Sequence, residues 1–454
     1  MFRKSNRILK HSLMLMVLNV VAMTFANDSF AYKWAGTNER FEVAPGLSIG
    51  GSFRTRYEFM SDFKFNKNTA GNDDSRTLNQ FRLNAQWNPF GWMTFFVEGQ
   101  DARVFGENAV TNKNTDPSVG FIHDPWDLHQ AYVDFKNATP ADLFYLRNIR
   151  VGRQKINLGD ERLVGALEWA NTARVWDGVV VSFGEPKKRT LDVIAAMEVD
   201  VNPNNPNSWN DLELSTSRYQ DSNLYGLYYT DWLLIENTQL ELYWLTRSNG
   251  DTAASGAATS HGDEVHSIGT RFEHKHGAMD FNGEFVGQFG EYSGLDHKAF
   301  AGHIEAGYMV EELNKTRFAL AYNYASGDDD STDGKHTTFD NLFPTNHKFY
   351  GDMDFFAWMN MHNIEASAKT KLFNKADVRL AYQLFWLAQE HDSWYAASRA
   401  AARTASASAN VSSFVGSELD LTVKFWIVPK RLDMLLGYGH FFAGSYIDDT
   451  NSGG

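Results

Sequence analysis

From residue 47 onward, apolar and polar side chains alternate along many stretches of the chain. Arg82, Asn84 and Gln86, for example, alternate with apolar residues between positions 81 and 87. This period of two is typical of a β-strand with two different faces, and a tilted strand of about ten residues is long enough to cross a bilayer. The pattern predicts about seventeen strands. They cover approximately residues 47–59, 78–88, 93–102, 128–136, 147–158, 175–184, 190–200, 221–230, 238–246, 265–275, 279–289, 300–309, 315–325, 361–372, 375–388, 414–426 and 431–442.

The connections between these strands alternate in length. Short turns, as at 88–92 and 185–188, alternate with long loops, as at 60–77 and 103–127. This rhythm is typical of an outer-membrane barrel. The sequence therefore predicts an all-β fold, a transmembrane antiparallel β-barrel. Because single-chain bacterial barrels have an even number of strands, about 18 are expected where about 17 are visible. The chain is predicted to lack its C-terminal strand, and a miscount is the alternative.

The first 31 residues have the pattern of a secretory signal peptide. Four basic residues come first, Arg3, Lys4, Arg7 and Lys10. A short apolar run over 13–26 follows, with small residues that favour cleavage near 26 or 31. A membrane anchor is the alternative, but the run is shorter than the roughly 20 residues of a spanning helix. We expect a signal peptide over residues 1–31 and a barrel with long external loops over residues 32–454.

Composition narrows the function classes. The 454 residues include no cysteine, which excludes a disulfide scaffold, a thiolate metal site and a cysteine nucleophile. A net charge of −14, from 42 basic and 56 acidic residues, makes a nucleic-acid partner unexpected, because phosphate binding needs a basic surface. The chain contains no Gly-x-Ser-x-Gly, His-Glu-x-x-His or phosphate-loop motif. The sequence therefore predicts no enzyme and no catalytic residues.

Two segments are too specific for a generic barrel. One runs from Gly152 to Gly165 (GRQKINLGDERLVG) and continues at 169–178 (WANTARVWDG). The other includes 323–328 (NYASGD) and 338–351 (TFDNLFPTNHKFYG). Together they resemble the alginate-export family of outer-membrane porins. The resemblance implies an 18-stranded barrel whose closing strand is missing here, and a passive channel for an anionic polysaccharide with an arginine-rich constriction.

Basic residues on the polar side of several strands are the candidate pore lining. That side carries more basic than acidic residues only in the first five predicted strands. Arginine suits a carboxylated sugar because its guanidinium stays charged and binds a carboxylate through two parallel hydrogen bonds, and anion-selective pores commonly use Arg or Lys rings. The candidate pore-lining and substrate-binding residues are Arg54, Arg56, Arg82, Arg153, Lys155, Arg162, Arg174 and Arg379. The alternative, which stays open, is that these groups pair with Glu58, Glu98 and Asp134 and brace the barrel wall.

The loop at 159–174 is expected to fold into the barrel. Acidic residues flank its two arginines in the sequence. The loop-bracing residues are predicted to be Asp160, Glu161 and Asp177, in salt bridges with Arg162 and Arg174. Such pairs would hold the loop in an inward position.

Two further features are expected in the external loop at 326–360. Leu342–Thr345 is predicted to be an ordered segment in the external mouth, acting as a gate, a plug or a purely structural loop. Asp329, Asp333 and Asp340 roughly match the spacing of a calcium loop, although no helices flank them. A solvated acidic loop is the alternative reading, and no other cofactor is expected.

These patterns predict a channel in the outer membrane of a Gram-negative bacterium. Its expected task is the passive passage of an anionic polysaccharide or carboxylated saccharide. One alternative is an uptake porin for small carboxylated or sugar solutes, and another is a structural or adhesion barrel with a closed pore. The expected partners are an anionic saccharide, outer-membrane lipid and lipopolysaccharide, and periplasmic export proteins, with the channel itself a monomer.

Overall fold

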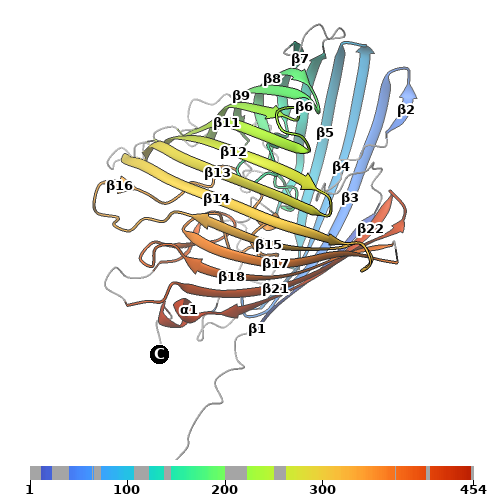
Figure 1. Ribbon diagram of the computed structural model, residues 1–454. Coiled ribbons are helices and arrows are strands. Elements are labelled where there is room, and N and C mark those ends of the chain that lie inside the picture. Colours follow the sequence, from blue (N-terminus) through green and yellow to red (C-terminus); the bar gives the residue numbers. More distant parts are fainter. Residues whose placement is uncertain are drawn as a thin grey trace, which may run out of the picture.

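The chain forms one large, strongly curved antiparallel sheet in a computed structural model (Figure 1). The structure describes residues 12–22 (backbone only), 40–63, 65, 73–106, 122–136, 145–199, 222–249, 262–373, 375–404 and 410–450. Among the described residues, no helix is long and apolar enough to cross a membrane.

All seventeen strands predicted from the alternation are present, most of them within three residues of the predicted ends. The first nine are β3 (Leu47–Met60), β4 (Asp74–Phe90), β5 (Met93–Phe105), β6 (Asp124–Lys136), β7 (Leu146–Gln154), β8 (Trp176–Glu185), β9 (Arg189–Glu198), β10 (Ser222–Asp231) and β11 (Thr238–Asn249). The other eight are β12 (Glu264–His276), β13 (Met279–Tyr292), β14 (Leu295–Val310), β15 (Thr316–Ala325), β17 (Met361–Leu372), β18 (Ala376–Leu387), β21 (Phe414–Val428) and β22 (Leu432–Ala443). Each pairs antiparallel with the next in this order.

Several shorter elements accompany the large sheet. They are β2 (Phe41–Ala44), β16 (Lys335–His336), β19 (Trp394–Tyr395), β20 (Ala401–Arg403), the 3₁₀ turn η3 (Asn346–Lys348) and the helix α1 (Ser445–Thr450). The strand β2 forms a hairpin with the start of β3, and α1 follows the last strand.

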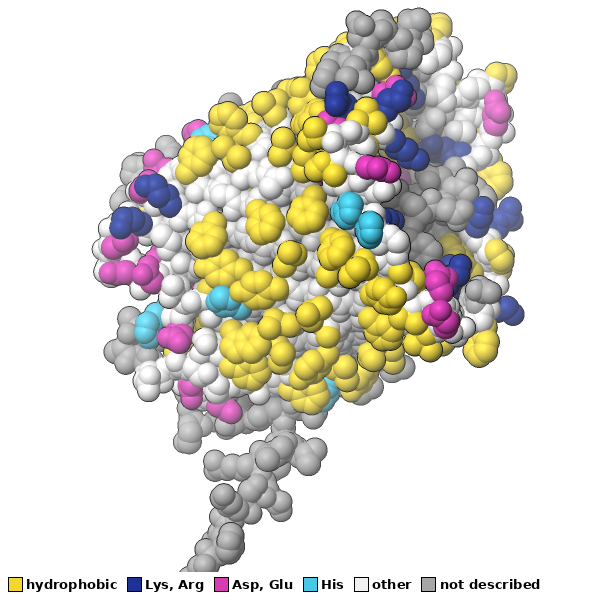
Figure 2. Space-filling view, viewed as in Figure 1, with side chains coloured by type: hydrophobic (Ala, Val, Ile, Leu, Met, Phe, Trp, Pro, Cys, Tyr) yellow, Lys and Arg dark blue, Asp and Glu magenta, His cyan; other side chains and the backbone are white. Residues whose placement is uncertain are grey.

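The two faces of the sheet have opposite chemistry, as the alternation requires. In β4, Phe81 and Leu83 are 40% and 54% exposed, whereas Arg82 between them is 3% exposed. Hydrophobic side chains are spread over the outer surface of the barrel wall (Figure 2). The arginine face points to the interior, where other parts of the chain cover it. This arrangement suits lipid outside and polar groups inside.

The two ends of the barrel differ in their connections. Tight turns, such as the one joining β4 and β5, lie at the end where β2 is found, at the upper right of Figure 1. Long connections, including the one that carries β16, lie at the opposite end, on the left. In outer-membrane barrels the short turns face the periplasm and the long loops face outward. We refer to these as the short-turn end and the long-loop end.

An additional strand, β1 (Ser12–Ala22), lies between β22 and β3 and pairs antiparallel with both. It reaches only residues 53–60 of β3, while β2 pairs with residues 47–49 of the same strand. No pairing joins β2 to β22 among the described residues, so the sheet is not closed along its whole height. β1 brings the count to the expected eighteen, but its residues belong to the predicted signal peptide. Cleavage of that peptide, and the barrel boundaries it sets, stay predictions.

Candidate functional site

Two connections fold into the barrel and join each other there. We call residues 155–175, between β7 and β8, the first inner segment, and residues 337–360, between β16 and β17, the second inner segment. An isolated parallel bridge links Val164 to Phe343. The backbone N–H of Phe343 donates to the carbonyl of Leu163 at 2.7 Å, and that of Gly165 donates to the carbonyl of Phe343 at 2.9 Å. Leu342–Thr345, predicted to be ordered, is therefore a buried part of this junction rather than a free tip.

The wall formed by β3–β5 holds one end of the first inner segment. Arg54 donates to the carbonyl oxygens of Glu168 and Ala170 at 2.7 and 3.0 Å, and Arg56 donates to that of Trp169 at 2.6 Å. Arg56 also pairs with Glu58 at 2.7 Å. Both predicted pore-lining arginines are buried, and their terminal nitrogens donate to the first inner segment.

Glu168 sits between two further predicted pore-lining residues. Arg82 donates to its carboxylate at 2.8 Å, and Lys155 forms an ion pair with it. Burial alone would raise the pKa of Glu168, but the two cations outweigh that effect and lower the pKa to about 2. Glu168 is therefore ionised and fixed, and it offsets part of the positive charge that the sequence assigned to this quadrant.

The opposite wall receives the other end of the first inner segment. Asp160 lies 3.4 Å from Arg162 and 3.8 Å from Arg271 of β12. Burial raises the pKa of Asp160, but Arg162 and Arg271 outweigh it and hold the pKa below the usual range. Gly159 adopts φ +56°, and a Cβ there would lie 2.7 Å from the hydroxyl of Tyr228. Since β12 lies about halfway around the sheet from β3, the segment crosses the lumen.

Arg162 lies at the centre of this crossing. Its guanidinium donates to the Tyr350 hydroxyl at 3.2 Å and to Asn323 of β15 at 3.3 Å, and it stacks 4.0 Å from the ring centre of Phe349. Glu161, next to it, accepts a hydrogen bond from Thr345 at 3.2 Å and lies 3.9 Å from Lys348. Burial raises the pKa of Glu161, and Lys348 offsets this only in part.

Among the described residues, Glu161 and Asp177 do not pair with Arg162 or Arg174 as expected. Arg174 pairs with Glu198 at 2.6 Å and donates to the carbonyl oxygens of Gly165 and Pro344, but it contacts none of the three predicted loop-bracing carboxylates among the described residues. Asp177 instead accepts two hydrogen bonds from Arg153, from Nε at 2.9 Å and from Nη2 at 3.0 Å. Arg153 and Arg174 are thus both engaged at the start of β8.

Arg379 reaches the second inner segment from β18. It lies 3.3 Å from Asp352 and 3.2 Å from Glu365. Glu418 of β21 accepts a hydrogen bond from the backbone N–H of Met353 at 2.9 Å. These contacts attach the segment to a third part of the wall. Seven of the eight predicted pore-lining residues therefore contact or belong to the inner segments, whereas the side-chain contacts of Arg153 are with β6 and β8 of the wall. The eight do not form a single ring.

The structure does not assemble the predicted calcium site. Asp340 is buried in the interior, where its carboxylate receives Arg247 at 2.7 Å, whereas Asp329 and Asp333 are exposed on the long loop. Asp333 is paired with Lys335 at 2.8 Å. Within the described ranges, no group of three His, Asp or Glu side chains is placed to hold a metal ion. Asp340 is drawn inward because a buried guanidinium is its nearest cation.

The sequence did not single out Glu168, Trp169 and His347 as a unit. Glu168 and Trp169 adjoin the arginine motif, and His347 lies in the second motif, so both stretches were recognised. The rings of Trp169 and His347 are stacked, although the two residues are 178 positions apart in the sequence. Spacing along the chain carries no signal for such a pair.

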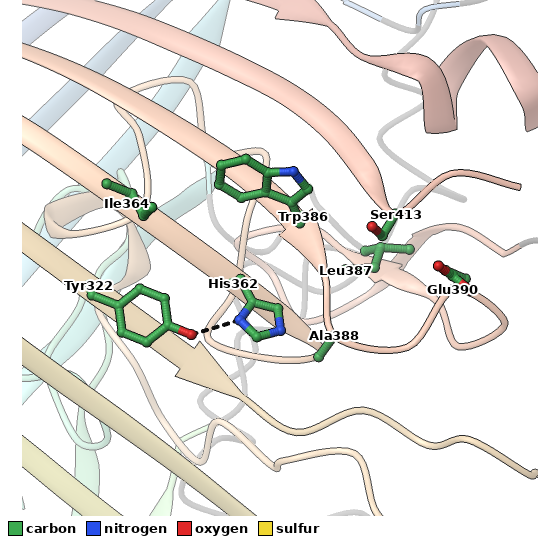
Figure 3. A pocket seen from close by; sticks show the side chains of 8 residues that line it. All are labelled: Tyr322, His362, Ile364, Trp386, Leu387, Ala388, Glu390 and Ser413. Carbon is green, nitrogen blue, oxygen red and sulfur yellow. Dashed lines mark hydrogen bonds between the residues drawn. The ribbon is translucent and has the colours of Figure 1, made fainter.

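A shallow depression on the outer surface is separate from this network (Figure 3). Tyr322, His362 and Trp386 line it where β15, β17 and β18 approach the long-loop end, and the Tyr322 hydroxyl and His362 Nδ1 are hydrogen bonded at 2.7 Å. These side chains lie on the outward face of their strands. The depression therefore belongs to the lipid-facing side and not to the lumen.

A two-faced barrel wall with inward-folded connections defines an outer-membrane channel of the porin class. The chain belongs to the alginate-export family: the family model described as "Alginate export" matches residues 46–453. No curated protein matches the chain. Family membership and fold together place the protein in the outer membrane of a Gram-negative bacterium.

One solved porin structure shares the fold at low sequence identity, and two others are similar at lower TM-scores. A BenF-like porin from Pseudomonas fluorescens Pf-5 is 10% identical, with a TM-score of 0.52 and coverage of 96% of this chain and 98% of that one. OccK11 (OpdR) from Pseudomonas aeruginosa is 11% identical, with a TM-score of 0.47 and 95% of both chains covered. OccK2 (OpdF) from the same organism, solved in complex with glucuronate, is 10% identical, with a TM-score of 0.46 and coverage of 95% and 98%.

Proposed function

We propose that this channel passes an anionic, carboxylated polysaccharide across the outer membrane. The observation that carries the proposal is the convergence of Arg54, Arg56 and Arg82 on residues 168–170 of the first inner segment. The segment narrows the lumen, and guanidinium groups border it on the side of β3 and β4. A chain of uronate units presents carboxylates at regular intervals, and arginine recognises carboxylate with two donors in a fixed geometry.

Most of these arginines are already bonded to carbonyl or carboxylate oxygens. Their role in the proposal is therefore to hold the inner segment and to set the electrostatic potential of the constriction, rather than to bind each sugar directly. A buried guanidinium acts over several ångströms because screening by water is weak there. The two roles that the sequence left open, lining and bracing, are combined in the same side chains.

Planar-bilayer recordings test the proposal. We expect the full-length protein to conduct, to favour anions over cations, and to be blocked by oligogalacturonate but not by a neutral maltooligosaccharide of equal length. The absence of any current would contradict a channel and favour a structural barrel. Equal block by the charged and neutral oligosaccharides would contradict the preference for a carboxylated substrate.

A paired substitution tests the electrostatic part. Arg82→Gln keeps a donor for Glu168 while removing one charge, and we expect it to reduce the anion preference. Trp426, 39% exposed on the outer surface, offers the matched control Trp426→Phe, which should leave selectivity unchanged. If Arg82→Gln leaves the reversal potential in a salt gradient unchanged, the constriction potential does not depend on this quadrant.

A further inference from the structure

A second basic feature lies nearer the short-turn end than the inner segments. Two aromatic rings, Phe96 of β5 and Tyr132 of β6, face the lumen among polar neighbours and are stacked, with ring centres 5.0 Å apart. Arg40 lies 5.1 Å from the ring centre of Phe96, and Arg150 of β7 lies 4.1 Å from that of Tyr132. The rings thus hold a guanidinium each by cation–π contact.

The local geometry of β7 makes room for this arrangement. Gly152 pairs with Tyr132 across the ladder and adopts φ +121°. A Cβ at Gly152 would lie 2.3 Å from the carbonyl oxygen of Ala131, so no other residue fits without a shift of the backbone. With no side chain at this position, Arg150 reaches across the face of Tyr132. The two stacked rings and their guanidinium groups are therefore part of the barrel wall.

The charges of this cluster do not cancel. Arg150 is neutralised by Asp134, to which it donates two hydrogen bonds of 2.8 Å. Arg40 instead donates to the amide oxygens of Asn84 and Gln86, at 3.2 and 2.5 Å. Its bonds use Nε and Nη1, and among the described residues Nη2 has no hydrogen-bond acceptor and no carboxylate pairs with the group. A half-buried guanidinium with a spare donor is poised for an anion.

Two neighbours set the charge balance around Arg40. Lys136 is exposed and donates to the Thr94 hydroxyl at 3.1 Å. It is a second cation that has no carboxylate partner among the described residues. Glu98 lies one lumen-facing position deeper on β5, and the amides of Asn84 and Gln130 donate to it at 3.2 and 2.9 Å. Lys and Arg side chains, with a few Asp and Glu side chains among them, lie around the hollow at the end of the barrel near β2–β5 (Figure 2).

We infer that Arg40, held against Phe96, and Lys136, held on Thr94 one lumen-facing position nearer the turn, form a carboxylate-binding site at the short-turn end of the lumen. It takes the carboxylate of a uronate unit before the polymer reaches the inner segments. The inference rests on the proposed function and adds the place where the substrate first binds. A site ahead of the constriction raises the local concentration of an anionic polymer at the side from which it arrives.

Sided block of the channel tests this site. Oligogalacturonate is added to the short-turn side of a single channel, and the association rate of blocking events is measured. An arginine–carboxylate contact of about 1.4 kcal/mol corresponds to a tenfold change, so we expect Arg40→Gln to reduce block about tenfold. Lys375→Gln, with the same charge change in an exposed turn at the same end, is the matched control and should have no effect. Addition from the long-loop side should show a smaller difference.

The outcomes separate the two proposals. If the wild-type channel conducts but is never blocked by oligogalacturonate, the proposed function fails. If wild-type block is present and Arg40→Gln leaves it unchanged, only the site at Arg40 is overturned. Lys136→Gln is a second variant in case Arg40→Gln does not fold: it removes the other cation of the site and is expected to lower the association rate of block several-fold, whereas an unchanged rate would also overturn the inference. Inorganic phosphate at equal charge serves as a probe for a nonspecific anion effect.

Discussion

The imidazole ring of His347 lies flat on the indole ring of Trp169, with ring centres 3.7 Å apart and an angle of 8° between the planes. The guanidinium of Arg56 lies 4.1 Å from the centre of the same indole ring. His347 is held in turn by Asp354, at 3.0 Å from its Nδ1. Trp169 therefore joins the barrel wall, the first inner segment and the second inner segment at one point.

Replacing Trp169 with leucine should loosen the second inner segment. The substitution removes both ring contacts but keeps an apolar side chain, and we expect a loss of about 1–3 kcal/mol. Limited proteolysis within residues 346–355, together with thermal unfolding, measures the effect. Trp87→Leu is the control because Trp87 is 47% exposed on the outer surface. Equal proteolysis of the two variants would show that Trp169 does not hold the segment.

Removal of the Arg54 side chain should weaken the attachment of residues 168–170 to the wall. Arg54→Ala leaves the carbonyl oxygens of Glu168 and Ala170 without their donor, at a cost of about 2–3 kcal/mol. Arg54→Lys should restore the charge but only one of the two hydrogen bonds, because an ammonium group lacks the fork of a guanidinium. Thermal unfolding of the three proteins measures the difference. A lysine variant as stable as the wild type would show that charge alone matters there.

The Glu168 cluster should make stability depend on pH in the acid range. A carboxylate whose pKa is lower in the folded state stabilises the protein above its unfolded pKa, and this contribution disappears as the pH falls through the folded value. With a folded pKa of about 2, the contribution of Glu168 is complete at pH 7 and at pH 5 and declines between about pH 4.5 and 2.

Glu168→Gln isolates that contribution. At pH 7 it should destabilise the protein by about 3 kcal/mol, because Arg82 and Lys155 lose a buried ionic partner, and the difference from wild type should shrink below pH 4. Glu161→Gln is the matched control on the same segment: burial raises the pKa of Glu161, so neutralising it should cost little. A constant difference between wild type and Glu168→Gln from pH 7 to pH 3 would contradict the assignment.

Asp340 is expected to act through Arg247 and not through a metal ion. Asp340→Asn should destabilise the protein by about 3 kcal/mol because it leaves a buried arginine with one carboxylate fewer. Chelation with EDTA should leave thermal unfolding of the purified protein unchanged, and Asp329→Asn should have no effect. A fall in melting temperature on chelation that Asp329→Asn abolishes would restore the calcium interpretation.

Sequence periodicity was sufficient for the barrel wall. Strands such as β13 and β21 were found because lipid on one face and polar groups on the other impose a period of two that neighbours along the chain share. The inward loops were also found, through the motifs at 152–165 and 338–351. Some predicted pairs form, such as Asp160 with Arg162 and, in the bracing alternative, Glu58 with Arg56, whereas others do not. The role of these residues in the pore stays a prediction.

Three arginines have partners that the sequence did not predict. Arg174 pairs with Glu198 rather than with a neighbour in the motif, and Arg247 reaches Asp340, which is 93 residues away. Arg40 was missed because it precedes the first alternating stretch and is matched only to amides. In each case the partner depends on which parts of the chain the fold brings together inside the barrel. Spacing along the sequence carries no signal of these contacts.

The sequence by itself determined the two-faced wall, the strand order, the alternation of short and long connections, and the presence of arginines on the interior face. Only the tertiary structure decided which groups neutralise those arginines and which of them hold the inner segments. The physical reason is that strand patterning is a local response to lipid and water, whereas neutralisation of a buried charge depends on whichever group the folded chain brings within hydrogen-bonding distance.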